Sequence, residues 1–217
     1  MIKQKKHKTS QMPLNVFKLA VLVSGRGSNL QAIIDSIDQK ELHAHISIVI
    51  SNKIDAMALE RAKKHDIKTI FIDPASYLDK NAYDKALVEK LKFFSVDLIC
   101  LAGYMRILGE EVIQTFKEKI INIHPSLLPA FPGLNAQKQA IEYGVKFSGC
   151  TVHFVDSGVD SGPIISQTVV PIYDDDDEKS LSERILKEEH NLYPKAIRMI
   201  KEKQLKINNR TVTRKTH

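Results

Sequence analysis

The chain has 217 residues, 43% of them hydrophobic, and a formal net charge of +6. This length suits a single domain of generous size, with two small domains as the weaker alternative. No stretch approaches the roughly 20 apolar residues that would span a bilayer. Residues 1–8 carry four Lys, and residues 201–217 carry six Lys or Arg with one Glu. The rest of the chain is therefore acidic, which argues against a nucleic-acid enzyme, since such an enzyme is basic where it works.

We expect one domain over residues 17–203, flanked by loosely ordered basic tails at 1–16 and 204–217. The N-terminus is basic, but no apolar stretch follows it before residue 17, so no secretory signal is expected. The two cysteines, Cys100 and Cys150, lie in apolar runs typical of buried strands. Buried free thiols fit a reducing compartment, and we expect a cytoplasmic protein.

Strand and helix patterns alternate over the first 120 residues. Short apolar, β-branched runs predict strands at 17–24, 45–51, 68–72, 97–102 and 120–123. Apolar residues at helical spacing predict helices at 28–39, 56–65, 80–93 and 110–116. Such alternation is typical of a parallel sheet with helices on both faces and right-handed crossovers.

The alternation of strand and helix patterns ends after Pro132. A short helix is predicted at 136–143, followed by two strands at 150–155 and 164–171 that a Gly-rich loop joins into a hairpin. A long helix is predicted at 180–203, with an interruption around Tyr193-Pro194. Five acidic residues at 174–178 precede it, and we interpret them as a solvated helix start rather than a metal site. The expected fold is an open, mostly parallel, Rossmann-like α/β sheet with helices on both faces, a C-terminal antiparallel addition and a long final helix.

Residues 24–29 (Ser-Gly-Arg-Gly-Ser-Asn) link the first strand to the first helix. A Gly-rich turn at this place aims free backbone N–H groups at an anion. Leu30 stands where a dinucleotide fingerprint would have its third Gly, and the Gly-Lys-Ser/Thr of a Walker loop is missing. One small phosphate is the ligand that fits, with Ser28 and Asn29 as further donors. A plain turn capped by Ser28 remains the alternative.

Residues 122–129 (Asn-Ile-His-Pro-Ser-Leu-Leu-Pro) begin at the carboxyl end of the fifth predicted strand, where ligands bind in open α/β sheets. Asn122 and His124 are two residues apart, so their side chains point the same way on an extended chain. An amide and an imidazole that face one small volume are hard to explain by packing alone. We therefore predict that the chemistry centres on His124, with a satisfied core histidine as the alternative.

The loop at 155–163 contains Asp156 and Asp160. It could be an ordinary hairpin loop, or it could bring a carboxylate against His124. A carboxylate there would raise the imidazole pKa above its ordinary value of about 6.5 and make a general acid at neutral pH. His153, on the preceding strand, is interpreted as a packed residue.

Residues 103–108 (Gly-Tyr-Met-Arg-Ile-Leu) follow the fourth predicted strand. An apolar segment at this edge of a sheet could line the pocket of a flat aromatic ligand. Helix packing explains the same segment equally well.

Taken together, these segments resemble phosphoribosylglycinamide formyltransferase, the folate-dependent enzyme of purine synthesis. The resemblance runs from about Lys18 to Ile200 and rests on residues 24–33, 51–53, 101–108, 122–129 and the Asp-Ser-Gly-Pro loop. It implies a phosphate-binding half at about 17–117 and a catalytic half at about 118–203. The implied roles are catalysis for Asn122, His124 and Asp160; phosphate binding for Gly27, Ser28 and Asn29; amine-substrate binding for Glu189; and folate binding for Lys80, Met105, Arg106, Ile107, Leu108, Asp156, Ser157, Gly158 and Val159.

Four positions depart from the pattern of some relatives. Lys80 stands where Arg is common, which keeps the charge but loses the bidentate fork. Asn135 and Gln137 stand where some relatives have histidines, and Arg26 replaces a neutral residue.

The resemblance implies transfer of a formyl group from 10-formyltetrahydrofolate, as co-substrate, to the amine of 5'-phosphoribosylglycinamide. Asn122 would donate to the developing oxyanion, and His124, held cationic by Asp160, would donate a hydrogen bond or a proton. We expect no metal, because no spacing of His, Cys and carboxylates suits one. We expect small-molecule substrates, no nucleic acid, no membrane partner, and a monomer or homodimer.

Three rival functions differ in what they require. A formyltetrahydrofolate hydrolase would carry an extra N-terminal regulatory domain, and a methionyl-tRNA formyltransferase a C-terminal RNA-binding domain. A non-catalytic nucleotide-binding module would use only the turn at 25–29, and it would leave the placement of Asn122 and His124 unexplained.

Overall fold

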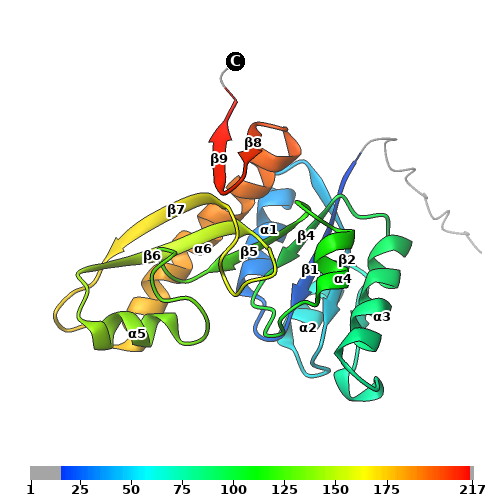
Figure 1. The fold of residues 1–217 in the computed structure, drawn as a ribbon, viewed down its shortest axis with the longest axis horizontal. Helices are drawn as coiled ribbons and strands as arrows, with labels where there is room; N and C mark the ends of the chain where they lie inside the picture. The colour runs from blue at the N-terminus through cyan, green and yellow to red at the C-terminus, as the bar shows by residue number, and fades with distance from the viewer. Residues whose placement is uncertain (1–15, 216–217) are drawn as a thin grey trace, which may run out of the picture.

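The computed structural model describes residues 16–215 and contains one seven-stranded sheet in the order β3-β2-β1-β4-β5-β6-β7 (Figure 1). Its strands are β1 (Phe17–Val23), β2 (Ala44–Ser51), β3 (Thr69–Phe71), β4 (Leu98–Leu101), β5 (Ile120–His124), β6 (Phe147–Phe154) and β7 (Ile164–Pro171). The helices are α1 (Ser28–Asp38), α2 (Met57–Lys64), η1 (Pro74–Ser76), α3 (Lys80–Phe93), α4 (Glu110–Thr115), α5 (Ala136–Tyr143) and α6 (Glu178–Lys201). The predicted fold class is confirmed.

The apolar strands are covered on both faces. Alternate residues of β1 show this, because Leu19 and Val21 join one apolar cluster while Ala20 and Leu22 join the other. Helices α1, α2 and α6 contribute to the first cluster, and α3 and α4 contribute to the second. A strand buried on both faces reads as a continuous apolar run, as predicted for a parallel sheet.

The sheet reverses its strand order next to β1. This strand pairs in parallel with β2 on one side and with β4 on the other. The connections after β1 and β4 therefore leave in opposite directions and open a crevice at the carboxyl ends of these strands, which is where open α/β sheets bind ligands. The turn at 24–29 follows β1, and the segment at 103–108 follows β4.

The predicted antiparallel addition is present. Strand β6 pairs antiparallel with β5, and β7 pairs antiparallel with β6. Strand β6 begins at Phe147, three residues before the predicted start. Figure 1 shows the β6–β7 hairpin extending away from the parallel strands, with α6 running behind it. This hairpin carries the loop at 155–163 back toward the end of β5.

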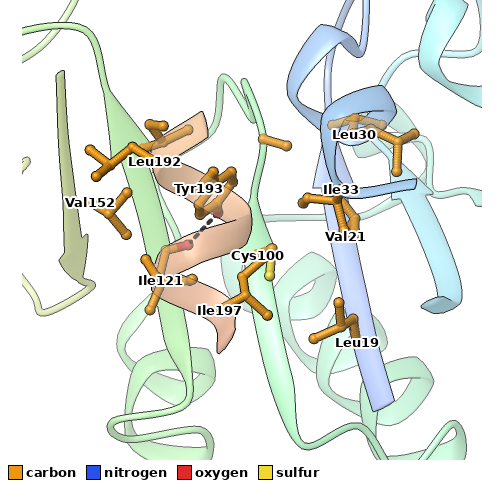
Figure 2. Close-up of a cluster of buried hydrophobic side chains, with 14 of the residues drawn as sticks. Leu19, Val21, Leu30, Ile33, Cys100, Ile121, Val152, Leu192, Tyr193 and Ile197 are labelled. Atoms are coloured by element: carbon orange, nitrogen blue, oxygen red, sulfur yellow. Dashed lines mark hydrogen bonds between the residues drawn. The ribbon is translucent and has the colours of Figure 1, made fainter. Parts of the chain in front are cut away.

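The predicted interruption of the last helix is wrong. Helix α6 continues through Pro194, although this residue lacks the N–H that a helix interior uses. The helix persists because Tyr193, Ala196 and Ile197 are fully buried on either side of the proline. Tyr193 is directed at the sheet (Figure 2), and its hydroxyl donates to the carbonyls of Leu101 and Ile121 at 2.9 and 3.2 Å.

The expectation of a loosely ordered C-terminal tail is also wrong. Strands β8 (Leu205–Asn208) and β9 (Thr211–Arg214) pair as an antiparallel hairpin. Leu205, Ile207 and Val212 pack against the main apolar cluster, and this burial orders the segment despite its basic charge. The basic N-terminal segment lies outside the described residues, apart from its last position. Within residues 16–215, the structure has no helix that is both long and apolar enough to cross a membrane.

Candidate active site

The carboxylate of Asp160 is the hub of a polar cluster at the end of β5. Its Oδ2 lies 3.2 Å from Nδ1 of His124 and accepts the N–H of Gly133 at 2.8 Å. Its Oδ1 accepts a hydrogen bond from Nδ2 of Asn122 at 3.2 Å. The spacing of the sequence could not establish the contact between Asp160 and His124, and the folded chain makes it.

The pairing of β5 with β6 places residues of the two strands side by side in this cluster. Asn122 pairs with His153, and His124 pairs with Thr151. His153 is 2% exposed, and its Nε2 lies 3.3 Å from Asn122 Nδ2 and 3.6 Å from Asp160 Oδ1. The sequence analysis interpreted His153 only as a packed residue, but it is a member of the cluster. Its place on the strand that leads into the aspartate loop was the one available signal.

The expected rise in the pKa of His124 is wrong. Burial lowers the pKa of this side chain, which is 5% exposed, below the ordinary value of 6.5. The hydrogen bond with the Phe131 carbonyl and the charge of Asp160 act in the opposite direction without overcoming burial, and His153 adds to the lowering. The imidazole is therefore neutral at neutral pH, because desolvation penalises its cation more than one carboxylate favours it.

Both ring nitrogens of His124 nevertheless face acceptors. Nδ1 faces Asp160, and Nε2 lies 2.8 Å from the carbonyl oxygen of Phe131. A neutral imidazole has one N–H, whereas its cation has two. The contacts therefore complement the cation, while burial disfavours it in the resting protein.

Asp160 itself stays ionised. Burial acts to raise the pKa of this carboxyl, but the contact with His153 and the hydrogen bond from the Gly133 N–H outweigh it. The net effect lowers the pKa, so Asp160 is a stable acceptor for the donors around it. Its backbone φ of 50° is left-handed, which non-Gly residues adopt uncommonly and which aims this side chain into the cluster.

A hydrogen-bond network centred on the buried Thr151 holds the loop that follows His124. The hydroxyl of Thr151 donates to the Ser126 carbonyl at 2.7 Å and accepts the N–H of Leu128 at 3.1 Å. Gln167 Nε2 donates to both Thr151 Oγ1 and the Leu128 carbonyl at 2.9 Å. These contacts from β6 and β7 hold the loop that brings the Phe131 carbonyl to His124.

The N-terminus of α1 is left open for a ligand. Gly27 is the N-cap residue in a left-handed conformation, and no side chain caps the helix, so the alternative of a turn capped by Ser28 is wrong. The first N–H groups of a helix lack intrahelical partners. They point, together with the helix dipole, at the space where an anion would lie.

Asn29 joins this turn to α6. Its Nδ2 donates to Oε2 of Glu189 at 2.8 Å, while its buried Oδ1 has no hydrogen-bond partner in the described structure. Burial raises the pKa of Glu189 to about 7, although the hydrogen bond from Asn29 acts to lower it. An unpaired buried acceptor beside a buried carboxyl is suited to a ligand that brings N–H or O–H donors.

A cavity of about 940 Å³ lies in the crevice, between the turn after β1, the segment after β4 and helix α6. Among the predicted site residues, Gly27, Ser28, Asn29, Met105 and Glu189 line it. Ile123 and Pro125, the neighbours of His124 in the chain, also line it. Ser24, Lys53 and Gln137, which the sequence analysis named, also line the cavity, as do Ser182, Glu183 and Leu186, which it did not single out.

The segment at 105–108 begins at one edge of the crevice, where Met105 lines the cavity. Its backbone is anchored by Ser24, whose Oγ accepts the N–H of Met105 at 2.7 Å. Met105 and Ile107 are 63% and 65% exposed, whereas Leu108 is buried. Lys80 Nζ donates to the Leu108 carbonyl at 3.3 Å, so the predicted basic residue lies against this edge. Exposed apolar side chains of this kind suit a flat ligand.

The guanidinium of Arg106 lies 4.4 Å from the centre of the Tyr83 ring. Tyr83 shares a 2.7 Å hydrogen bond with the hydroxyl of Tyr104. This cation–π contact therefore directs Arg106 toward α3 and stabilises the base of the segment.

The loop at 156–159 has its own internal order. Asp156 Oδ1 accepts the N–H of Gly158 at 3.1 Å and the hydroxyl of Ser161 at 2.6 Å. These bonds close the loop on itself, so Asp156 shapes the turn that carries Asp160. Ser157 and Gly158 are exposed, and Val159 is 53% exposed at the tip.

The acidic run before α6 caps that helix, as interpreted. Asp177 is the N-cap residue in a reciprocal capping box with Ser180. Asp176 pairs with Arg184 through two hydrogen bonds at 2.6 and 2.8 Å. No group of His, Cys, Asp and Glu within residues 16–215 could hold a metal ion. Asp177 and Glu178 also line the cavity, which the sequence pattern did not indicate.

Comparison with known proteins agrees with this geometry. The formyl transferase family model matches residues 17–197. Phosphoribosylglycinamide formyltransferase of Bacillus subtilis is 44% identical over 193 residues, which cover 89% of this chain and 97% of that protein. The crystal structure of glycinamide ribonucleotide transformylase 1 from Symbiobacterium toebii superposes with a TM-score of 0.90 at 49% identity, covering 92% of this chain and 94% of that one.

A longer relative matches over only part of its length. The trifunctional purine biosynthetic protein adenosine-3 of Drosophila melanogaster is 50% identical over 185 residues, which are 84% of this chain and 14% of that protein. The match of the family model and the near full-length bacterial relative agree with each other. This chain belongs to the formyl transferase family, in the branch of the phosphoribosylglycinamide formyltransferases.

Proposed function

We propose that this protein transfers the formyl group of 10-formyltetrahydrofolate to the amine of 5'-phosphoribosylglycinamide in purine synthesis. The observation that carries the proposal is the cluster of Asn122, His124 and Asp160 beside a crevice. One side of this crevice suits a phosphate and the other a flat ligand. The names of the relatives give the same reaction class.

The amine substrate would bind along α1 and α6. Its phosphate would accept hydrogen bonds from the turn at 27–29, where the N–H groups of the helix start are open. Its donors would reach the unpaired Oδ1 of Asn29 and the carboxyl of Glu189. This orientation would direct the amine toward the end of β5.

The formyl donor would bind against the other edge of the crevice. The exposed side chains of Met105 and Ile107 offer an apolar surface to its ring system. The loop at 156–159 would form the facing wall. Lys80, held against the Leu108 carbonyl, would supply a positive charge for the acidic end of the donor.

The reaction would proceed by direct attack. The neutral amine attacks the formyl carbon, a C–N bond forms, and the carbonyl oxygen becomes an oxyanion to which Asn122 donates. The bond from the formyl carbon to the folate nitrogen then breaks. The proton lost by the attacking nitrogen is transferred to the leaving nitrogen through His124 or a water.

We infer a different part for His124 from the one that the sequence suggested. Nε2 of the neutral imidazole would leave the Phe131 carbonyl to accept the proton from the attacking nitrogen, and Asp160 would stabilise the cation that results. Burial then favours release of that proton to the leaving group. His124 would therefore act as a proton carrier rather than as a standing cation.

A formyl-transfer assay tests the proposal against its rivals. The purified protein would be mixed with glycinamide ribonucleotide and 10-formyltetrahydrofolate, beside a control without the amine. We expect a formylated amine in the first reaction and no formate in the second. Formate release without the amine would identify a hydrolase, and binding without turnover would identify a nucleotide-binding module.

The proposed setting is the cytoplasm, where free thiols such as Cys100 and Cys150 stay reduced. We propose a monomer or homodimer with small-molecule substrates and no metal.

A further inference from the structure

The Gly-rich turn is held from behind by helix α2. The carbonyl of Gly25 accepts the N–H of Ala58 at 3.0 Å. The carbonyl of Arg26 accepts a hydrogen bond from Nε of Arg61 at 2.8 Å. The C=O and N–H of one trans peptide point in opposite directions. Tying these two carbonyls to α2 therefore turns the N–H groups of Arg26 and Gly27 to the opposite side, where the turn lines the cavity.

Helix α2 touches the turn without any space between them. A Cβ added at Gly27 would lie 2.6 Å from Cβ of Ala58 and 2.8 Å from its Cα, which is closer than such atoms approach. Gly27 also has a φ of 73°, which favours glycine. The shape of the turn thus depends on where α2 lies, and Arg61 adds a side-chain hydrogen bond to this contact.

Arg61 is itself held in place by α1. Its Nη1 donates to Oε1 of Gln31 at 3.4 Å, and Nε2 of Gln31 donates to Oδ1 of Asp35 at 2.8 Å. The planar guanidinium can make both contacts at once because its donors are arranged as a fork. It joins α2, the turn and α1, the three elements that surround the start of α1.

The charge of Arg61 is not neutralised by a neighbour. Within residues 16–215 its guanidinium is in no ion pair, unlike that of Arg184, which pairs with Asp176 at 2.6 Å. A guanidinium stays protonated at any ordinary pH. It therefore adds a constant positive potential behind the turn, on the side away from the cavity.

We propose that Arg61 is a positioning residue for phosphate recognition. It orients the N–H of Gly27 through the Arg26 carbonyl and strengthens the attraction of the turn for an anion. This inference rests on the proposed function, in which the anion is the phosphate of the amine substrate. Arg61 acts through the turn and does not contact the substrate itself.

The test compares two amines in the Arg61→Met variant: the phosphorylated substrate and the corresponding glycinamide riboside without phosphate. We expect the KM for the phosphorylated amine to rise about tenfold or more, the range of one lost charge-assisted hydrogen bond. The KM for the formyl donor, kcat at saturation and kcat/KM for the riboside should stay unchanged. An equal loss on both amines would show a merely structural role and overturn the proposal.

Two further variants separate charge from hydrogen bonding and from general effects of helix α2. Arg61→Lys keeps the charge without the fork, so we expect a smaller rise in the KM for the phosphorylated amine than in Arg61→Met. Lys63→Met is the matched control, because Lys63 is exposed on the same helix and its side chain pairs, among the described residues, only with Glu60 at 2.8 Å. A rise in this control equal to that of Arg61→Met would also contradict the proposal.

A binding measurement makes the inference independent of formyl transfer. Calorimetric titration with ribose 5-phosphate should give a dissociation constant about tenfold weaker in Arg61→Met than in the parent. Equal affinities, or no binding to the parent, would overturn the proposal even if formyl transfer occurs. A parent that binds this ligand but transfers no formyl group would refute only the proposed function. If Arg61→Met does not fold, Arg61→Gln and Arg61→Lys provide the same comparison.

Discussion

The candidate chemistry depends on a few side chains that share one carboxylate. Asp160 receives contacts from Asn122, His124 and the Gly133 N–H, and each of its two oxygens has its own partners. A carboxylate with several donors holds them in fixed directions. At the scale of single residues, Asp160 thus sets the directions of the side chains that the proposed mechanism uses.

Removal of the imidazole tests the centre of this cluster. His124→Ala should cut turnover by two orders of magnitude or more, because it removes the proposed proton carrier, and such groups typically contribute 100-fold or more. Substrate dissociation constants should change little, since the turn at 27–29 and the apolar edge remain. Steady-state kinetics with calorimetric titrations measures both, with the exposed His43→Ala as control. Near-parental turnover in His124→Ala would refute the mechanism.

The charge of Asp160 should set the pH dependence. Asp160 acts to raise the pKa of His124, although burial keeps that pKa below 6.5. In the proposed mechanism the neutral imidazole is the active form, so kcat/KM of the parent should fall as the pH drops below the pKa of His124. In Asp160→Asn the raising effect disappears, and the acid limb of the residual activity should move to lower pH. An NMR titration of the His124 ring would report the same direction, and an unchanged titration would argue against the pairing.

The residues of the cluster were predicted to different degrees. The two-residue spacing of Asn122 and His124 on a strand end predicts that they share one side. The contact of Asp160 depends on a loop 36 positions further along the chain, beyond the antiparallel β6. Residue spacing cannot predict a contact between positions so far apart in the chain. Only the family resemblance and the chemical need for a carboxylate beside the imidazole suggested it. The pKa direction of His124 was wrong because burial is a property of the folded environment.

Local sequence patterns were most informative about the positions of the strands and helices. Apolar periodicity predicts the strands and helices to within a few residues, because burial on both faces leaves continuous apolar runs. It fails where tertiary packing overrides a local signal. Pro194 is tolerated in α6 because its neighbours are buried, and the basic C-terminal segment folds because three apolar side chains find the main cluster.

The C-terminal hairpin provides a test at this scale. Truncation after residue 203 removes β8 and β9, including the packed side chains of Leu205, Ile207 and Val212. We expect the free energy of unfolding to fall by about 2–4 kcal/mol, since these side chains are only partly buried and each full burial is worth about 1.5–3 kcal/mol. Urea unfolding measures this loss, and kcat at a temperature well below the transition should stay near that of the full chain. Unchanged stability would mean that the hairpin contributes nothing.

The whole molecule decides the position of the site. The reversal of strand order at β1 opens the crevice, and α6 closes one side of it with Glu189. Glu189 lies 160 positions from Asn29, yet their side chains share a 2.8 Å hydrogen bond in the interior. A buried carboxyl of this kind lowers stability when it ionises, and the cost belongs to the fold as a whole.

Glu189 should make stability depend on pH. Its pKa is about 7 in the folded protein against an ordinary value of 4.5. The stability that the protonated carboxyl contributes to the folded state is therefore fully present below pH 4.5 and is lost as the pH rises through about 7. At pH 8 the ionised carboxyl lowers the free energy of unfolding by on the order of 3 kcal/mol. Glu189→Gln should therefore be more stable than the parent at pH 8 and similar to it at pH 4.5. Urea unfolding at both pH values, with the exposed Glu183→Gln as control, measures this difference, and a gain that is independent of pH would contradict it.

The sequence by itself determined the α/β class, the order of the elements and the two motifs that follow β1 and form the end of β5. These are local properties, because periodicity, turn residues and two-residue spacing act over a few positions of the chain. Only the tertiary structure decided that Asp160 and His153 meet the end of β5, that Glu189 reaches Asn29, and that α2 holds the turn through Arg61. It also decided that His124 is neutral, since desolvation and long-range contacts exist only once the chain is folded.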